Sequence, residues 1–252
     1  MSFSGKVVLI TGASSGIGAD AARHLASKGA SVSIVGRNEK RLNAVAEEII
    51  KAGHPTPLAI VADVTKDVER IVDETIKKFG KLDVLVNNAG IVAQDNVVDI
   101  ELSGFDRIFN TNLKSVIMLS KLCVPHLEKT RGNIVNVSSV AGLKCIQNVL
   151  SYSMSKAALD QFTKCSALDL APKHIRVNSI NPAAIETPIF QVGDLSKELI
   201  DRVRDDCISK YPVKRIGDVS DTSSAIAYLA DENAASFLTG ILLTIDGGYM
   251  LV

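Results

Sequence analysis

The stretch Thr11–Gly18, which reads TGASSGIG, decides the fold class of this chain. It follows the apolar run Val7–Thr11 and leads into Ile17–Lys28, whose apolar residues recur at helical spacing until Gly29. A glycine-rich turn between a strand and a helix lets the backbone approach a pyrophosphate, whose charge the first N–H groups of the helix stabilise. The spacing is G-x-x-x-G-x-G, not the commoner G-x-G-x-x-G, and a purely structural turn is the alternative. The dinucleotide-phosphate contacts that this turn predicts are Gly12, Ser14, Ser15, Gly16, Ile17 and Gly18.

The whole chain alternates short β-branched runs with longer amphipathic segments. This alternation is typical of βαβ units and of a parallel sheet covered on both faces by helices. No repeat, low-complexity tract or linker interrupts it, so we predict one α/β domain over residues 1–252, with a doubly wound, seven-stranded parallel sheet of the Rossmann type. The expected strands are Val7–Thr11, Ser31–Val35, Leu58–Val61, Val84–Asn87, Asn133–Val137, Arg176–Ile180 and Leu242–Ile245. Further helices are expected to begin near Asn38, Val68, Gly104, Tyr152 and Val219.

Composition excludes several classes of protein. The chain balances 28 basic against 28 acidic side chains, whereas binding a polyanion requires a clustered excess of Lys and Arg, so we expect no nucleic-acid partner. No apolar stretch approaches the ~20 residues that cross a bilayer, so we expect no membrane span. The four cysteines and four histidines are scattered without metal-ligand spacing, so we expect no metal site. The first residues lack a signal-peptide pattern, so we expect a cytoplasmic protein.

The end of the second expected strand bears on the choice of cofactor. In dinucleotide-binding sheets this position meets the adenosine ribose, where a carboxylate suits the hydroxyls of NAD and an arginine suits the 2′-phosphate of NADP. The sequence here is Gly36-Arg37-Asn38, and no acid occurs before Glu39. We therefore predict NADP(H) in preference to NAD(H). The alternative is that Arg37 is an ordinary solvated cation.

Tyr152 and Lys156 stand four residues apart and therefore lie on one face of the helix that they begin. A phenol needs its pKa lowered from about 10 to work as an acid–base group near neutral pH, and both an adjacent ammonium and a cationic nicotinamide favour the phenolate. Such a pair also arises by chance, so its context decides. Ser138-Ser139 and Asn87–Gly90 each follow an expected strand, where open parallel sheets bind ligands. Turn formation and capping alone are the alternative for these residues.

Four groups of residues, in order along essentially the whole chain, resemble the compact single-domain form of the short-chain dehydrogenase/reductase family. They are Thr11–Gly18, Asn87–Gly90, Ser139 with Tyr152 and Lys156, and Asp246–Gly248. The resemblance implies a catalytic tetrad of Asn112, Ser139, Tyr152 and Lys156. Tyr152 would exchange a proton with the substrate oxygen, and Ser139 would hydrogen-bond the same oxygen. Lys156 would lower the phenol pKa and bond the nicotinamide ribose, and Asn112 would hold a water that links Lys156 to bulk solvent.

The same resemblance implies further cofactor contacts. It places Asp63 and Val64 at the adenine and Thr187 at the carboxamide. The remaining implied contacts are Arg37, Asn38, Asn88, Ala89, Gly90, Tyr152, Lys156, Pro182 and Ile185. Ala183 follows Pro182 where the family usually has glycine, and alanine disfavours a positive φ beside the nicotinamide. Ser15 stands where some NADP-specific members have a basic residue, so phosphate recognition would fall on Arg37, with Ser14 and Asn38.

The predicted function is that of an NADP(H)-dependent oxidoreductase that transfers hydride between nicotinamide and a carbonyl/alcohol pair. The small-molecule substrate is expected to be medium-sized and partly apolar: a ketone, a steroid or an isoprenoid-like alcohol. One alternative is reduction of 3-oxoacyl groups on a carrier protein, which calls for a basic docking patch, with Arg131 and Lys173 as candidates. An alternative of another class is a non-catalytic NADP-binding sensor or scaffold. Loss of a tetrad residue would favour it, and all four are present.

The polar segment Glu186–Gly217 interrupts the alternation and is far longer than an ordinary connection in an α/β sheet. Long excursions at the carboxyl ends of parallel strands form substrate lids, so we expect a lid here, with a helix over about Ser196–Lys210. A surface excursion without function is the alternative. The pocket is also expected to draw on Val92–Asn96 and Lys144–Leu150, with Ile189 and Phe190 contributed by the lid.

Association with further copies of the chain is expected as well. The resemblance implies a homotetramer that pairs long helices and last strands. The apolar segments Phe237–Ile245 and Tyr249–Val252 are compatible with burial at such interfaces.

Overall fold

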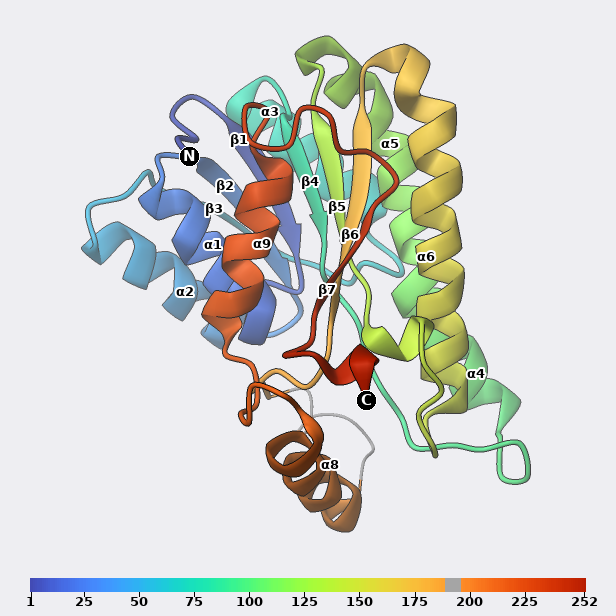
Figure 1. Cartoon of the computed structure of the whole chain (residues 1–252). Coiled ribbons are helices and arrows are strands. Elements are labelled where there is room, and N and C mark those ends of the chain that lie inside the picture. The colour runs from blue at the N-terminus through green and yellow to red at the C-terminus, as the bar shows by residue number, and fades with distance from the viewer. Residues whose placement is uncertain (189–195) are drawn as a thin grey trace.

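The computed structural model describes residues 1–188 and 196–252, and a seven-stranded, all-parallel sheet forms the centre of these residues (Figure 1). The strand order, β3-β2-β1-β4-β5-β6-β7, reverses beside β1, which is the switch point where open α/β sheets bind ligands. The doubly wound fold is confirmed, and β2 and β6 run slightly further than expected. The strands are β1 (Val7–Thr11), β2 (Ser31–Gly36), β3 (Leu58–Val61), β4 (Val84–Asn87), β5 (Asn133–Val137), β6 (Arg176–Pro182) and β7 (Leu242–Ile245).

Helices cover both faces of the sheet (Figure 1). They are α1 (Gly16–Ser27), α2 (Glu39–Lys51), α3 (Val68–Phe79), α4 (Leu102–Phe109), α5 (Ser115–Thr130), α6 (Leu150–Leu170), α8 (Lys197–Lys210) and α9 (Val219–Ala230). Because side chains alternate along a strand, Val8 and Ile10 of β1 face the core under α1, α2 and α9, whereas Val7 and Leu9 face the core under α3, α5 and α6. Among the described residues, no helix combines the length and apolarity needed to cross a membrane.

Two helix boundaries on the site side are set by side-chain hydrogen bonds. Asn38 is the N-cap of α2, and its side chain accepts a backbone N–H at 2.9 Å. α6 begins at Leu150, two residues before the expected start, because the Asp95 carboxylate accepts a hydrogen bond from Ser151 N at 3.1 Å. A π-helical segment that the sequence did not predict, η1 (Asn110–Lys114), joins α4 to α5. Asp95 and η1 both lie beside the end of α6 that carries Tyr152.

The excursion between β6 and α9 contains α8, in agreement with the expected helix. α8 lies beyond the carboxyl ends of the strands (Figure 1). Ile189 and Phe190, which were predicted for the pocket, lie outside the described residues.

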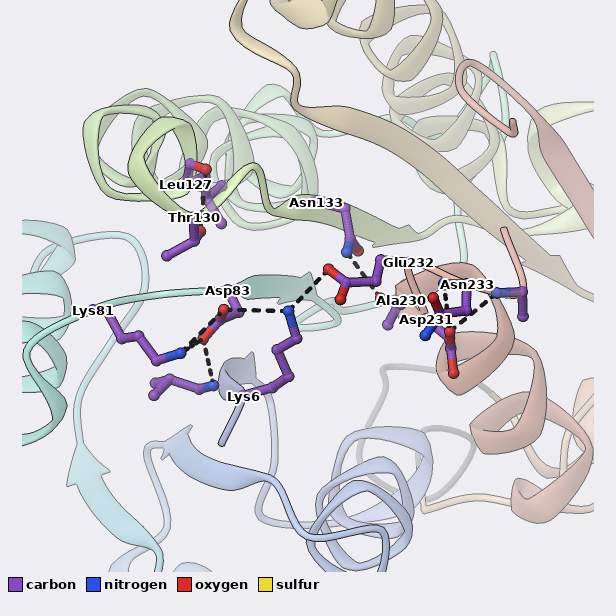
Figure 2. A network of polar contacts seen from close by, with 12 residues as sticks. Lys6, Lys81, Asp83, Leu127, Thr130, Asn133, Ala230, Asp231, Glu232 and Asn233 are labelled. Atoms are coloured by element: carbon purple, nitrogen blue, oxygen red, sulfur yellow. Dashed lines mark hydrogen bonds and ion pairs between the residues drawn. The ribbon is translucent and has the colours of Figure 1, made fainter. Parts of the chain in front are cut away.

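A buried carboxylate joins three elements at the amino-terminal edge of the sheet (Figure 2). Asp83 is 4% exposed, and its Oδ2 accepts a hydrogen bond from Val7 N at 2.8 Å and lies 3.0 Å from Lys81 Nζ. Lys6 Nζ lies 3.8 Å from Asp83 Oδ1 and 2.9 Å from the carboxylate of Glu232, which follows α9. Asp83 therefore connects β1, β4 and the end of α9.

Replacing Asp83 with alanine is expected to lower the free energy of unfolding by about 1–3 kcal/mol, because the buried N–H of Val7 loses its partner. Urea denaturation followed by circular dichroism measures the change. Glu128→Ala is the matched control, since its half-exposed ion pair with Lys173 is expected to contribute at most about 1 kcal/mol. Equal losses in the two variants would contradict this role of Asp83.

Candidate active site

The predicted phosphate turn packs directly on the segment that follows β4. Asn88 Nδ2 donates hydrogen bonds to Thr11 O at 2.8 Å and to Gly12 O at 3.2 Å. A Cβ on Gly12 would lie 2.8 Å from this nitrogen, and a Cβ on Gly18 would overlap it. Gly12 also has a φ of +65°, which residues with a side chain disfavour. Both glycines are therefore required by packing, and Gly18 is buried behind the turn.

The first turn of α1 is suited to an anion. Ser15 is the N-cap in an extended conformation, and its side chain makes no capping hydrogen bond. The first N–H groups of α1, together with the positive end of the helix dipole, therefore remain available to a pyrophosphate. Thr187 reaches the same turn from beyond β6, since a Cβ on Gly16 would lie 3.2 Å from Thr187 Cβ. The predicted phosphate and carboxamide contacts thus face each other.

The end of β2 offers two cations and no carboxylate to an adenosine ribose. Gly36 passes so close to Ser14 that an added Cβ would lie 3.0 Å from Ser14 Cβ. Arg37 is exposed and lines the cleft. Arg41, in the first turn of α2, lines the cleft as well. Arg41 was not among the predicted contacts, although its position one helical turn after Arg37 indicates that the two side chains lie on one side.

Asp63, predicted at the adenine, follows β3 and carries a negative charge. Its Oδ1 accepts hydrogen bonds from the backbone N and the hydroxyl of Thr65 at 2.9 and 2.8 Å. Partial burial works to raise the pKa of Asp63, but these hydrogen bonds and the charge of Arg37 outweigh it and hold the pKa below its usual value. Asp63 and the neighbouring Val64 both line the cleft.

Ser139, Tyr152 and Lys156 converge on one wall of the cleft from the end of β5 and from α6. The Ser139 hydroxyl hydrogen-bonds the Tyr152 side chain and also lies within 3.4 Å of Pro182 O. Lys156 Nζ donates a hydrogen bond to Val137 O at 2.8 Å and lies 5.6 Å from the centre of the Tyr152 ring. The three side chains that the sequence separates into two segments are therefore neighbours.

Burial opposes a charge on both members of the Tyr–Lys pair. It raises the pKa of Tyr152 above its usual value; Asp160 adds to this effect, and the hydrogen bond from Ser139 opposes it. Burial also lowers the pKa of Lys156 to about 8, against the attraction of Asp160. In the protein by itself the net direction is upward, because loss of hydration outweighs the hydrogen bond from Ser139; that Lys156 lowers the phenol pKa stays a prediction.

Asn112 lies in the π-helical segment η1, a kind of irregularity that is frequent at functional sites. Its Oδ1 accepts a hydrogen bond from Ile91 N, and its Nδ2 donates to Ile91 O, both at 2.9 Å, and to Ser155 Oγ at 3.0 Å. Gly90 lies close to both Asn112 and Lys156, since a Cβ there would lie 3.5 Å from Asn112 Oδ1 and 3.6 Å from Lys156 Nζ. Asn112 therefore lies close to Lys156 but does not line the cleft, because its amide is hydrogen-bonded to the backbone of Ile91 and to Ser155.

Apart from Gly18 and Asn112, the predicted site residues line one cleft of about 1320 Å³. Small-molecule sites typically hold roughly 300–1,000 Å³, so the cleft has room for a dinucleotide and a substrate together. The glycines that admit no Cβ, the uncapped helix α1 and the two arginines after β2 all fit a nicotinamide dinucleotide. The predicted residues that line the cleft are Gly12, Ser14, Ser15, Gly16, Ile17, Arg37, Asn38, Asp63, Val64, Asn88, Ala89, Gly90, Ser139, Tyr152, Lys156, Pro182, Ile185 and Thr187.

Two tyrosines that were not predicted for the pocket, Tyr211 and Tyr249, also line the cleft. The ring centroids of Tyr211 and Tyr249 lie 5.0 Å apart, and Lys144 Nζ lies 4.4 Å from the centre of the Tyr249 ring. Ala184 N donates a hydrogen bond to the Tyr211 hydroxyl at 3.3 Å, which connects the end of α8 to the backbone after β6. No local motif marks either tyrosine, because the C-terminal segment reaches the site only in the folded chain.

A family model described as Enoyl-(Acyl carrier protein) reductase matches residues 12–250. Curated relatives agree with it over the whole chain. Over 249 residues, this chain is 40% identical to an uncharacterized oxidoreductase of Thermotoga maritima, with 98% of each protein covered. The chain belongs to the short-chain dehydrogenase/reductase family.

Other relatives carry different substrate names. The 3-oxoacyl-acyl-carrier-protein reductase of Thermotoga maritima is 34% identical to this short-chain dehydrogenase/reductase, with 100% of each chain covered. The L-fucose dehydrogenase of Bos taurus is 36% identical, over 98% of this chain and 90% of its own.

Solved structures share the fold closely. A short-chain dehydrogenase/reductase of unknown function from Caenorhabditis elegans, determined with cofactor, superposes with a TM-score of 0.93 at 37% identity, covering 99% of this chain and 97% of its own. A 3-ketoacyl-(acyl-carrier-protein) reductase from Brucella melitensis, complexed with NADH, gives a TM-score of 0.88 at 36% identity, covering 98% of this chain and 99% of its own. The resemblance inferred from the motifs is confirmed, and the protein is an oxidoreductase of a family whose fold binds nicotinamide cofactors.

Proposed function

We propose that this short-chain dehydrogenase/reductase is an NADP(H)-dependent enzyme that transfers hydride between nicotinamide and a carbonyl/alcohol pair. The observation that carries the proposal is the convergence of Ser139, Tyr152 and Lys156 on one wall of the cleft that also contains the phosphate turn. These side chains supply a proton donor, a second hydrogen-bond donor and a cation at one place. The nicotinamide, when bound, supplies or accepts the hydride.

In the reductive direction, Tyr152 donates its hydroxyl proton to the carbonyl oxygen. Its raised pKa keeps the phenol protonated until the oxygen gains negative charge. Ser139 donates a hydrogen bond to the same oxygen and so orients it. The ammonium of Lys156 then stabilises the phenolate that remains. In the oxidative direction the phenolate accepts the alcohol proton.

The direct test follows NADPH consumption with ketones of graded size, and NADP⁺ reduction with secondary and steroid alcohols. Matched loss of NADPH and formation of the alcohol is the expected result. Binding of NADPH without turnover of any member of the panel would contradict the proposal and favour a sensor or scaffold.

The substrate in this proposal is medium-sized and partly apolar. Beyond Ser139, Tyr152 and Lys156 the lining includes aliphatic side chains and the two tyrosines, with the amide of Gln147 and the carboxylate of Asp206 among them. Such a lining suits a molecule that buries rings or chains and presents few polar groups. Relatives of nearly equal identity, 34% and 36%, act by name on acyl carrier protein and on a sugar, so identity alone does not choose a substrate.

Reduction of acyl groups on a carrier protein is the weaker candidate. Arg131 precedes β5 and Lys173 precedes β6, so both cations lie at the amino-terminal edge of the sheet, opposite the cleft. Lys173 Nζ is also 2.8 Å from the Glu128 carboxylate. The two residues that were predicted for a docking patch are therefore unsuited to bring a carrier protein to the catalytic wall.

Arg37→Asp is expected to lower the ratio of kcat/KM with NADPH to kcat/KM with NADH by about 10- to 100-fold, because a charge-assisted hydrogen bond contributes about 1.5–3 kcal/mol. Steady-state kinetics with both cofactors gives the ratio. Lys40→Asp is the matched control, since Lys40 is exposed in the same turn region and does not line the cleft. An unchanged ratio in Arg37→Asp would contradict the NADP assignment.

The excursion between β6 and α9 is the lid in this proposal. Ile200 and Asp206 of α8 line the cleft. Arg204 Nη2 lies 2.6 Å from the Glu186 carboxylate, and Glu186 N donates to Gly217 O at 2.9 Å, so the two ends of the excursion are held together.

The homotetramer is a further part of the proposal. Phe237 is 100% exposed, Leu251 is 85% exposed and Leu168 of α6 is 78% exposed in the single chain. Exposed apolar side chains of this size favour association. The cytoplasmic location stays a prediction from the sequence.

A further inference from the structure

One buried carboxylate beside the catalytic residues has no part in the proton transfer described above. Asp160 is 3% exposed and lies on α6 one turn after Lys156 and two turns after Tyr152, so the three residues share one face of the helix. An isolated buried carboxylate is costly, and an apolar side chain of similar size is often as good or better for stability at such a position. Stability alone therefore does not explain an acid here.

The contacts of Asp160 lead to the backbone of the catalytic serine. Asn181 Nδ2, from the end of β6, lies 2.9 and 3.0 Å from the two oxygens of the Asp160 carboxylate. The same nitrogen lies 3.1 Å from Ser139 O. Asn181 is fully buried, and its Oδ1 accepts a hydrogen bond from Ser179 Oγ at 2.6 Å, which fixes the direction of the amide. One amide group therefore joins the Ser139 turn to α6.

The far end of the Ser139 turn also packs closely against α6. Residues 140–142 form a single 3-10 turn, η2 (Val140–Gly142), directly after Ser139. A Cβ on Gly142 would lie 2.5 Å from Asp160 Oδ2 and 2.8 Å from the carbonyl carbon of Lys156. Ser138, the residue before Ser139, hydrogen-bonds the Asp160 carboxylate, and its hydroxyl oxygen lies 3.3 Å from Lys156 O. The carboxylate thus occupies the centre of the contact between this turn and α6.

We infer that Asp160 is a positioning residue: through Asn181, its carboxylate holds the turn that carries Ser139 in register with the helix that carries Tyr152 and Lys156. Ser139 and Tyr152 must reach one substrate oxygen together, and a small displacement of one relative to the other lowers the rate of the chemical step. The effect on catalysis rests on the proposed function; the hold on the turn does not.

The charge of Asp160 also acts on the neighbouring pair, where it favours the protonated forms of Tyr152 and Lys156. Burial raises the pKa of Asp160, while hydrogen bonds from Ser138 and Asn181 and the charges of Lys156 and Lys164 oppose that rise. In return, the carboxylate favours the protonated form of Lys156, which burial disfavours. An apolar residue at position 160 would remove both the hydrogen bonds to Asn181 and the charge that favours protonated Lys156.

The test compares Asp160→Leu and Asp160→Asn with Thr163→Val in the full-length protein. Thr163 is the matched control because it is also fully buried on α6 and also bonds a strand asparagine, Asn136 Nδ2 at 2.9 Å, whereas its own hydroxyl donates to Leu159 O within α6 and not to the Ser139 turn. We expect kcat to fall about tenfold or more in Asp160→Leu and less in Asp160→Asn, with KM changed by less than about threefold. Thr163→Val is expected to keep the wild-type kcat, while its melting temperature falls as in the Asp160 variants.

Hydrogen exchange supplies a readout that does not depend on catalysis. The backbone amides of residues 139–142 are expected to exchange faster in both Asp160 variants and at the wild-type rate in Thr163→Val. A kcat in both Asp160 variants equal to that of Thr163→Val, or unchanged exchange in the turn, would overturn the inference. If the wild-type protein reduced no carbonyl compound, the proposed function would fail, and the exchange data would still decide whether Asp160 holds the turn. Asp160→Asn keeps one acceptor and so serves if Asp160→Leu does not fold.

Discussion

The Tyr152→Phe variant is expected to lose about 10³-fold in kcat/KM for carbonyl reduction, which lies within the range for removal of a general acid. The phenol hydroxyl hydrogen-bonds Ser139 at the end of α6 that lines the cleft, and it is the proton donor in the proposed function. Phenylalanine keeps the ring and its packing but offers no proton to the carbonyl oxygen. The loss is expected in kcat, because the ring and not the proton contributes to substrate binding.

Three measurements make this prediction specific. The dissociation constant for NADPH, measured by fluorescence titration, is expected to stay within about threefold of wild type, since the phosphate turn is untouched. Tyr228→Phe removes a hydroxyl from a 38% exposed tyrosine of α9 and is expected to leave kcat/KM unchanged. Turnover by Tyr152→Phe within tenfold of wild type would show that another group supplies the proton.

The sheet and the phosphate turn were predictable because they depend on patterns within short segments. Each β-branched run identified one strand, and the turn between Thr11 and Gly18 identified the first βα unit. Side chains on separate segments were predictable only through the family resemblance. No spacing rule places Ser139 beside Tyr152, because a strand end and a helix meet there in the folded sheet.

Features that depend on long-range contacts could not be predicted from the sequence. α6 begins at Leu150 because Asp95 supplies a hydrogen-bond acceptor for Ser151 N from a segment far away in the chain. Tyr249 enters the pocket by packing on Tyr211. The rise in the Tyr152 pKa has a similar reason: proximity of a lysine is visible in the sequence, whereas the loss of hydration that raises the pKa depends on the finished fold.

Lys156→Met is expected to lower kcat/KM for reduction by about 10²-fold, the lower end of the range for acid–base assistance. Methionine keeps the unbranched, flexible shape of the side chain but removes the ammonium, which donates to Val137 O at 2.8 Å and lies 5.6 Å from the Tyr152 ring centre. The phenolate that forms when Tyr152 gives up its proton then has no nearby cation. The pKa of Tyr152, already raised by burial, is expected to rise further, and proton donation becomes less favourable.

The pH dependence separates the ammonium from a merely structural role of the side chain. Burial lowers the pKa of Lys156 from 10.5 to about 8, so the wild-type side chain is charged below this pH and neutral above it. The kcat/KM for reduction is therefore expected to decline as the pH rises through about 8, and Lys156→Met is expected to lack this step. Lys156→Arg keeps its positive charge throughout this pH range, so it is expected to recover part of the activity and to show no decline near pH 8. If Lys156→Met retained the wild-type pH profile of kcat/KM, the titrating group would lie elsewhere, and the Lys156 side chain would contribute through packing and not through its charge.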